Sequence, residues 1–176
     1  LSLIQEALER VPGVEGRIEP VDCGQPFTVL VDYAHTPDGL RNVLDTVNEF
    51  ARGRVIVVFG CGGDRDRSKR PLMGAIAAEN SDYAILTSDN PRSEPPGAIL
   101  GEIEAGFVGA GGSRDRYEVI EDRRTAIQKA VEMAKPEDVV LIAGKGHETV
   151  QIIGGRELPF DDRLVAREAI LGRTER

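Results

Sequence analysis

Asp89-Asn90-Pro91-Arg92 brings a carboxylate, an amide and a guanidinium together within four residues, with a proline that stiffens the backbone between them. The tetrapeptide follows residues 83–87, an apolar run with the pattern of a buried strand. A small zwitterion carries an ammonium and a carboxylate, so it needs rigid partners of both signs. We therefore expect this segment to bind one.

Three other polar segments also follow directly on predicted strands. They cover residues 32–38, 60–66 and 144–148, and each carries glycine or charged side chains. The carboxyl ends of parallel strands meet along one edge of a sheet, where ligands bind. The four loops together therefore predict a single ligand site.

Each of these loops also has a plainer interpretation. Residues 60–63 form either a tight turn or an anion site, and they lack the G-x-G-x-x-G pattern because Arg65 holds the last glycine position. Residues 144–148 form either a simple strand-to-hairpin turn with a solvated Lys145 or a part of the site, where Glu148 is placed to accept an ammonium. His35 is more typical of a structural hydrogen-bonding residue than of a catalyst.

Basic residues crowd into one short stretch of an acidic chain. The net charge is −8, which argues against nucleic acid or an anionic membrane as partner. Arg65, Arg67, Lys69 and Arg70 nevertheless lie within six positions, so we expect a local anion site there. Cys23 and Cys61 show no metal or redox spacing, and Cys61 is expected to be a small buried residue.

The length of 176 residues suits one domain. No stretch is long and apolar enough to span a bilayer and no signal-peptide pattern opens the chain, so a cytoplasmic location is the default expectation.

The elements that position these loops alternate between strand and helix. Strands are expected over 27–31, 54–59, 83–87, 117–120 and 138–143, and helices over 1–10, 37–50, 71–80, 96–108, 122–134 and 161–171. A hairpin of 150–153 and 157–160 is expected around Gly154-Gly155. This order predicts an α/β fold, Rossmann-like, whose mostly parallel sheet is flanked by helices and has an antiparallel edge strand from the terminal hairpin.

Six longer motifs, in this order along the chain, resemble the Mur ligases. They cover residues 16–19, 31–38, 59–66, 69–74, 89–92 and 144–148. The resemblance implies the C-terminal, amino-acid-binding domain of an ATP-dependent ligase over residues 21–176. Residues 1–20 would then be a remnant of the ATP-binding central domain and its linker.

In that family the motif Asp-Asn-Pro-Arg marks enzymes that select meso-2,6-diaminopimelate over L-lysine. The resemblance therefore implies that the complete enzyme joins diaminopimelate to UDP-N-acetylmuramoyl-L-alanyl-D-glutamate in peptidoglycan synthesis, using ATP and Mg²⁺. The P-loop, most of the magnesium ligands and the UDP-binding domain have no counterpart here. The isolated chain is accordingly expected to fold but not to catalyse.

Carried over position by position, the resemblance also assigns roles to residues. Those expected to bind diaminopimelate are Arg65, Asp89, Asn90, Pro91, Arg92, Gly144 and Glu148. Those expected to contact ATP are Arg17, Asp32, Tyr33 and His35. His35 is the one candidate for a catalytic residue, and no metal ligand is assigned.

Two alternatives stay open. The chain could be a free-standing module that binds an amino acid or a nucleotide without chemistry. It could also serve a ligase that takes L-lysine or another diamine, although Arg92 argues against this because lysine has no distal carboxylate to pair with a guanidinium.

Overall fold

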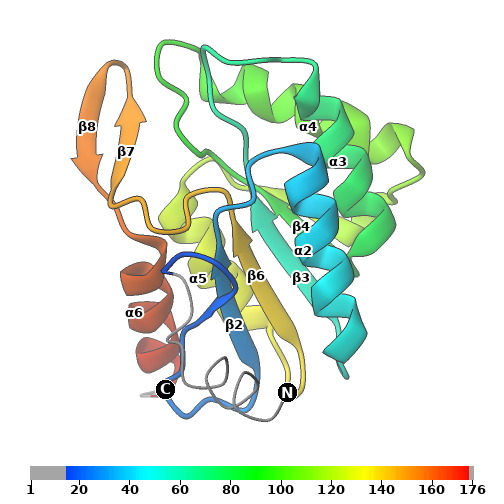
Figure 1. Cartoon of the computed structure of the whole chain (residues 1–176), viewed down its shortest axis with the longest axis vertical. Helices are drawn as coiled ribbons and strands as arrows, with labels where there is room; N and C mark the ends of the chain where they lie inside the picture. Colours follow the sequence, from blue (N-terminus) through cyan, green and yellow to red (C-terminus); the bar gives the residue numbers. More distant parts are fainter. Residues whose placement is uncertain (1–14, 175–176) are drawn as a thin grey trace, which may run out of the picture.

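The computed structural model describes residues 15–174 and has a six-stranded sheet at its centre (Figure 1). The strand order is β1-β2-β6-β3-β4-β5, and every pairing is parallel except that of β1 with β2. The strands are β1 (Glu19–Pro20), β2 (Thr28–Asp32), β3 (Val55–Phe59), β4 (Tyr83–Leu86), β5 (Tyr117–Val119) and β6 (Val139–Ala143). This confirms the predicted mostly parallel α/β architecture.

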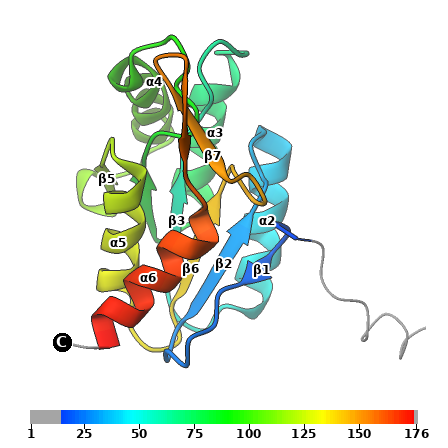
Figure 2. The ribbon, with the colours of Figure 1, turned by 90° about the vertical axis from the view of Figure 1, so that its left-hand side faces the viewer.

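Helices cover both faces of the sheet (Figures 1 and 2). Their bounds are α2 (Pro37–Phe50), α3 (Lys69–Asn80), α4 (Pro96–Gly109), α5 (Arg123–Met133) and α6 (Asp162–Thr174), with a short 3-10 turn over Arg114–Arg116. One core joins α2, α3 and α4 to the sheet, and a second joins α5 and α6 to its other face. Residues of β3 alternate between the two cores, which explains why this strand is apolar throughout.

The helices begin where the sequence provides caps. Thr36 accepts a hydrogen bond from the amide of Gly39, and Pro37 fits the first turn of α2 because a helix leaves its first amides unpaired. Asp122 caps α5 in the same way through the amide of Thr125, as predicted. Each cap ends a loop that follows a strand, and the Thr36 cap fixes where the site loop after β2 stops.

Helix α3 begins at Lys69, before the predicted start at Pro71. Proline is tolerated in the first turn of a helix, so Pro71 does not mark its beginning. The predicted helix over residues 1–10 lies outside the described residues. Among residues 15–174, no helix is long and apolar enough to cross a bilayer.

The predicted hairpin is present as β7 (Val150–Ile153) and β8 (Arg156–Pro159), but it forms a separate two-stranded antiparallel sheet. The antiparallel edge strand of the main sheet is β1 instead. The reason lies in the loop after β6, which carries the hairpin away from the sheet and against Arg92 (Figure 1). The amide of Arg92 donates to Ile152 O at 3.0 Å, and its carbonyl accepts from the amide of Gly154 at 2.8 Å.

Candidate functional site

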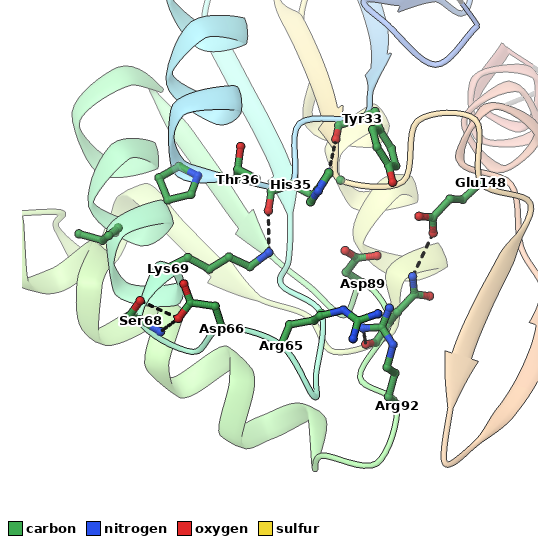
Figure 3. Close-up of a pocket in the computed structure, with 15 residues that line it drawn as sticks. Tyr33, His35, Thr36, Arg65, Asp66, Ser68, Lys69, Asp89, Arg92 and Glu148 are labelled. Carbon is green, nitrogen blue, oxygen red and sulfur yellow. Dashed lines mark hydrogen bonds between the residues drawn. The ribbon is translucent and has the colours of Figure 1, made fainter.

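A cavity of about 500 Å³ lies among the loops that follow β2, β3, β4 and β6, which are neighbours in the sheet (Figure 3). The predicted residues that line it are Tyr33, His35, Arg65, Asp89, Asn90, Arg92, Gly144 and Glu148. The structure therefore brings together most of the residues that the sequence singled out, from four separate loops.

Arg65 and Arg92, which we call the guanidinium pair, line the cavity beside Gly62. Arg65 donates only to the carbonyl of Asp64, at 3.3 Å, while Arg92 donates to Gly63 O at 2.8 Å and Asn90 O at 3.4 Å. Neither guanidinium forms an ion pair with a carboxylate of residues 15–174. Both can therefore receive a carboxylate from a ligand.

Asp89 and Glu148, the acid pair, also line the cavity. Asp89 is 6% exposed, and its Oδ1 atom accepts no hydrogen bond. Burial raises the pKa of Asp89, although Arg123 and Lys145 oppose this shift. Glu148 is half-buried and accepts a hydrogen bond from Asn90 Nδ2 at 3.0 Å through one oxygen only. The acid pair thus offers acceptors to an ammonium.

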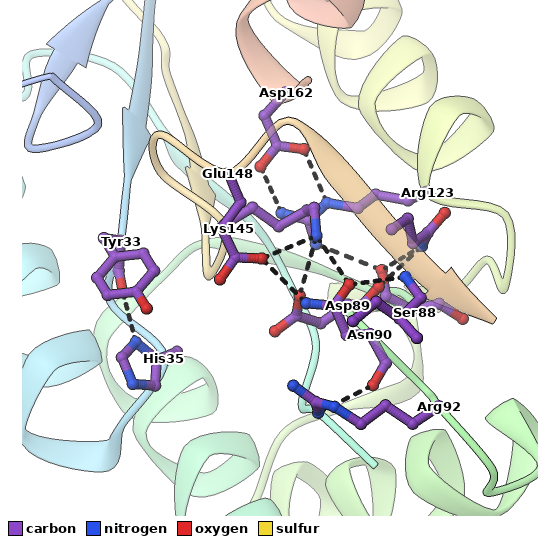
Figure 4. Close-up of polar contacts among 12 residues, drawn as sticks. Tyr33, His35, Ser88, Asp89, Asn90, Arg92, Arg123, Lys145, Glu148 and Asp162 are labelled. Carbon is purple, nitrogen blue, oxygen red and sulfur yellow. Dashed lines mark hydrogen bonds and ion pairs between the residues drawn. The ribbon is translucent and has the colours of Figure 1, made fainter. Parts of the chain in front are cut away.

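Lys145 is fully buried, so its interpretation as a solvated turn residue is wrong. Its Nζ atom lies 3.0 Å from Asn90 Oδ1, 3.2 Å from Glu148 Oε2 and 3.7 Å from Asp89 Oδ1 (Figure 4). The glycines on either side both have positive φ, 122° at Gly144 and 52° at Gly146. Glycine adopts this backbone conformation readily, and it lets the side chain of Lys145 point into the protein. The two flanking glycines were the only sign in the sequence that this lysine is buried.

A second buried ion pair lies behind the site and was missed by the sequence analysis. Arg123 donates to both carboxylate oxygens of Asp162, at 2.8 and 2.7 Å, and both side chains are fully buried. The same guanidinium reaches Ala143 O at 3.1 Å and Ser88 O at 3.5 Å (Figure 4). It therefore ties the ends of β6 and β4 together, just before the loops that carry Gly144 and Asp89.

The predicted anion site of four basic residues is only partly correct. Arg70 is fully buried and forms a two-point ion pair with Glu94, at 2.7 and 3.0 Å, and Arg67 pairs with Glu102. These carboxylates lie 24 to 35 residues further along the chain, so the crowding alone did not reveal them. Only Arg65 and Lys69 of the four line the cavity, and Lys69 Nζ donates to His35 O at 2.7 Å.

The residues predicted to contact ATP divide into two groups. The ring of Tyr33 lies 4.6 Å from that of His35 and 5.1 Å from that of His147, and the Arg17 guanidinium lies 5.2 Å from its centre. Asp32 does not line the cavity, because its carboxylate accepts the amides of Ile18 and Ala34, both at 2.8 Å. In this structure the carboxylate of Asp32 therefore holds two backbone amides in place.

Two further residues stand behind the cavity. Pro91 is buried and does not line it; its carbonyl packs against Gly63, where an added Cβ would meet it at 1.9 Å. Cys61 is 2% exposed, and burial raises its pKa to about 12. Its predicted interpretation as a small buried residue is confirmed.

Residues 15–174 contain no group of three or more His, Cys, Asp or Glu side chains that could hold a metal ion. The acid pair does not supply such a set by itself, and Lys145 already occupies the space between its members.

Comparison with known proteins gives one consistent result. The family model described as Mur ligase, glutamate ligase domain matches residues 16–146. The UDP-N-acetylmuramoyl-L-alanyl-D-glutamate--2,6-diaminopimelate ligase of Syntrophomonas wolfei is 58% identical over 173 residues, covering 98% of this chain and 35% of that protein. The ligase of the same name from Oceanobacillus iheyensis is 56% identical, covering 97% and 34%. The chain spans about a third of the length of these curated relatives.

Solved structures agree with the sequence relatives. A UDP-N-acetylmuramoyl-L-alanyl-D-glutamate--2,6-diaminopimelate ligase structure superposes with a TM-score of 0.85 at 42% identity, covering 96% of this chain and 34% of that one. The UDP-N-acetylmuramate-alanine ligase of Thermotoga maritima, with a TM-score of 0.62 and 20% identity over 97% of this chain and 32% of that one, shares the fold. The family match covers the cavity loops up to residue 146, and the relatives and the superposed structure cover 96% or more of the chain. This chain belongs to the Mur ligase family, and it contains that family's glutamate ligase domain.

Proposed function

We propose that this chain is the amino-acid-binding part of a ligase that adds meso-2,6-diaminopimelate to UDP-N-acetylmuramoyl-L-alanyl-D-glutamate. One observation carries the proposal. A single cavity offers two guanidiniums without carboxylate partners among residues 15–174, together with two carboxylates, one of which has a buried oxygen that accepts no hydrogen bond. This set matches a ligand end that carries one carboxylate and one ammonium. The relatives named for this reaction support the choice of diaminopimelate.

In the proposed complex, the distal end of diaminopimelate lies in the cavity. Its carboxylate binds the guanidinium pair and its ammonium binds the acid pair, while Asn90 and Gly144 form the surface between them. L-Lysine has no distal carboxylate, so it would leave both guanidiniums without a partner in a partly buried site. Sites built around such polar groups reject ligands that cannot satisfy them.

The remaining residues suit the nucleotide side of the reaction. We assign Arg17, Tyr33 and His35 to contacts with ATP, because Tyr33 and His35 line the cavity and the Arg17 guanidinium lies over the ring of Tyr33. Asp32 would act indirectly, by holding the backbone on both sides of this cluster. In the full reaction a substrate carboxylate takes the terminal phosphoryl group of ATP and releases ADP, and the amine of diaminopimelate then displaces phosphate.

Within this reaction the chain's own contribution is positioning. Holding the distal end of the diamino acid orders the proximal amine toward the activated carboxylate, which lowers the entropic part of the barrier. We place the ATP-binding loop and the Mg²⁺ ligands in the central domain, of which residues 1–20 would be the remnant, with residues 21–176 as the C-terminal domain. The substrates place the reaction in the cytoplasm, and the isolated chain should not release ADP.

Calorimetric titration of the 176-residue chain with meso-diaminopimelate and with L-lysine tests the proposal. We expect diaminopimelate to bind and lysine to bind at least about 30-fold more weakly, since the lost contacts are charge-assisted. Arg92→Ala should abolish the difference, whereas Arg41→Ala, an exposed arginine of α2, should preserve it. Equal binding of the two ligands by the unaltered chain would refute the selectivity.

A further inference from the structure

Lys145 occupies a place in the site that sequence similarity to the family did not assign. Its side chain is fully buried, and its ammonium lies within 3.7 Å of three side chains of the site, those of Asp89, Asn90 and Glu148 (Figure 4). Two of these belong to the loop after β4 and the third to the loop after β6. The lysine therefore connects two loops whose side chains must act together.

Lys145 and the backbone amide of Ile152 together determine which way the amide of Asn90 faces. Asn90 Oδ1 accepts from Lys145 Nζ and from the amide of Ile152, both at 3.0 Å, and Asn90 Nδ2 donates to Glu148 Oε2. An ammonium has donors and no acceptor, so the oxygen of the amide must face it. The amide nitrogen then points at Glu148 and holds that carboxylate at the cavity.

Lys145 also sets the charge of the acid pair. Asp89 and Glu148 together carry two negative charges when ionised, and the lysine leaves one. The other charged groups behind Asp89 are Arg123 and Asp162, which neutralise each other. One uncompensated negative charge matches one ligand ammonium.

We propose that Lys145 is a positioning residue of the diamino-acid site, which orients Asn90 and Glu148 and places one positive charge beside the acid pair. The inference rests on the proposed function, because it assumes that the acid pair binds a ligand ammonium. Burial already raises the pKa of Asp89, and Lys145 is one of the two cations that oppose this shift. Removing the lysine would raise that pKa further.

The test compares the unaltered chain with Lys145→Met, a variant of similar length without charge, by calorimetric titration with meso-diaminopimelate from pH 5.5 to 8. We expect the variant to bind diaminopimelate about 10- to 100-fold more weakly at pH 7.5, because small displacements of the residues that position a ligand have effects of this size. The loss should grow as the pH falls, because the pKa of Asp89, already raised by burial, rises further without the lysine, and protonated Asp89 no longer attracts the ammonium. Lys129→Met, which removes an exposed lysine of α5, should change neither the affinity nor its pH dependence.

The outcomes separate the two proposals. If the unaltered chain does not bind diaminopimelate, the proposed function fails and this inference fails with it. If the unaltered chain binds and folded Lys145→Met binds within threefold with the same pH profile, only the inference is overturned. Circular dichroism shows whether each variant is folded. If Lys145→Met is unfolded, Lys145→Gln replaces it, because glutamine keeps a donor for Asn90 Oδ1. The same criteria then apply to Lys145→Gln.

Discussion

Arg123 and Asp162 form a two-point ion pair, at 2.8 and 2.7 Å, with both side chains fully buried directly behind the candidate site. The pair joins the first turns of α5 and α6, and the same arginine reaches carbonyls at the ends of β4 and β6. The position of the site loops therefore depends on a charge contact that no ligand touches.

Arg123→Met should destabilise the chain by about 3–5 kcal/mol, because it leaves a buried carboxylate without a partner. Removing both charges in Arg123→Met with Asp162→Leu should restore part of this loss. Arg124→Met, which breaks an exposed pair with Glu168, should cost less than about 1 kcal/mol. Urea unfolding measures all three, and a double variant no more stable than Arg123→Met would contradict the explanation.

Arg92 has a left-handed backbone, with φ of 54°, which is held from both sides by hydrogen bonds to the hairpin. Glycine adopts this conformation without the steric cost that other residues incur, so Arg92→Gly should be about 1 kcal/mol more stable than Arg92→Ala. Both variants should lose selectivity for diaminopimelate over lysine. Thermal unfolding and calorimetry together separate the backbone effect from that of the guanidinium.

Gly63 marks a place where two loops of the site touch. A Cβ atom added there would lie 1.9 Å from the carbonyl oxygen of Pro91, which is backbone and cannot move aside freely. Gly63→Ala should therefore destabilise the chain by about 1–3 kcal/mol and weaken diaminopimelate binding. Gly101→Ala provides the matched control, since it lies in α4 with open space around it. Urea unfolding measures the stability. If Gly63→Ala is as stable as the original chain, the two loops are not in contact.

The Arg70–Glu94 pair predicts a dependence of stability on pH. Hydrogen bonds from Arg70 lower the pKa of Glu94 to about 2, from an ordinary value of 4.5. A carboxyl group whose pKa is lower in the folded state stabilises that state above its unfolded pKa. This contribution should decline as the pH falls from 4.5 toward 2. Urea unfolding across this range should show a shallower decline in Glu94→Gln, and an unchanged slope would count against the pair.

Asp89→Asn should separate stability from function. Because burial raises the pKa of Asp89, its ionised form is disfavoured in the folded state and costs stability at neutral pH. We expect the asparagine variant to unfold at the same or a higher urea concentration, yet to lose diaminopimelate binding. The exposed Asp45→Asn should change neither property, and a strongly destabilised Asp89→Asn would show that the carboxylate serves the fold.

The helices and strands were predicted well where apolar residues recur at regular spacing or where a nearby side chain caps a helix. Helix α2 has both of its predicted ends, because Thr36 and Pro37 fix its start and its apolar face repeats through Val47. The sequence also predicted that Asp89, Arg92, Arg65 and Glu148 would meet, because each follows a parallel strand. Caps and periodic burial depend on residues that are close in the sequence, and the position of a loop follows from the direction of its strand. Both can be inferred from the sequence.

The partners of the buried charges could not be predicted in this way. Arg70, Arg123 and Lys145 are all buried, and each pairs with a distant carboxylate, at 24, 39 and 56 positions respectively. A cation in a polar segment has the same local pattern whether it faces solvent or a distant carboxylate. The choice depends on which loops the sheet brings together, and here it buried Lys145, for which a solvated turn was one interpretation, and Arg70, which was expected in an anion site.

Arg65 and Glu148 reach the cavity from different loops, and this separation has a consequence for handedness. A tetrahedral carbon whose carboxylate and ammonium are both held has two positions left, one for its hydrogen and one for its chain, and the wall of the cavity decides which position can hold the chain. One mirror-image form sends that chain out of the cavity, and the other sends it into the protein. The two ends of meso-diaminopimelate are mirror images of each other. A site of this kind would therefore sort the two ends of a single molecule, so that the same amine is always left outside to react.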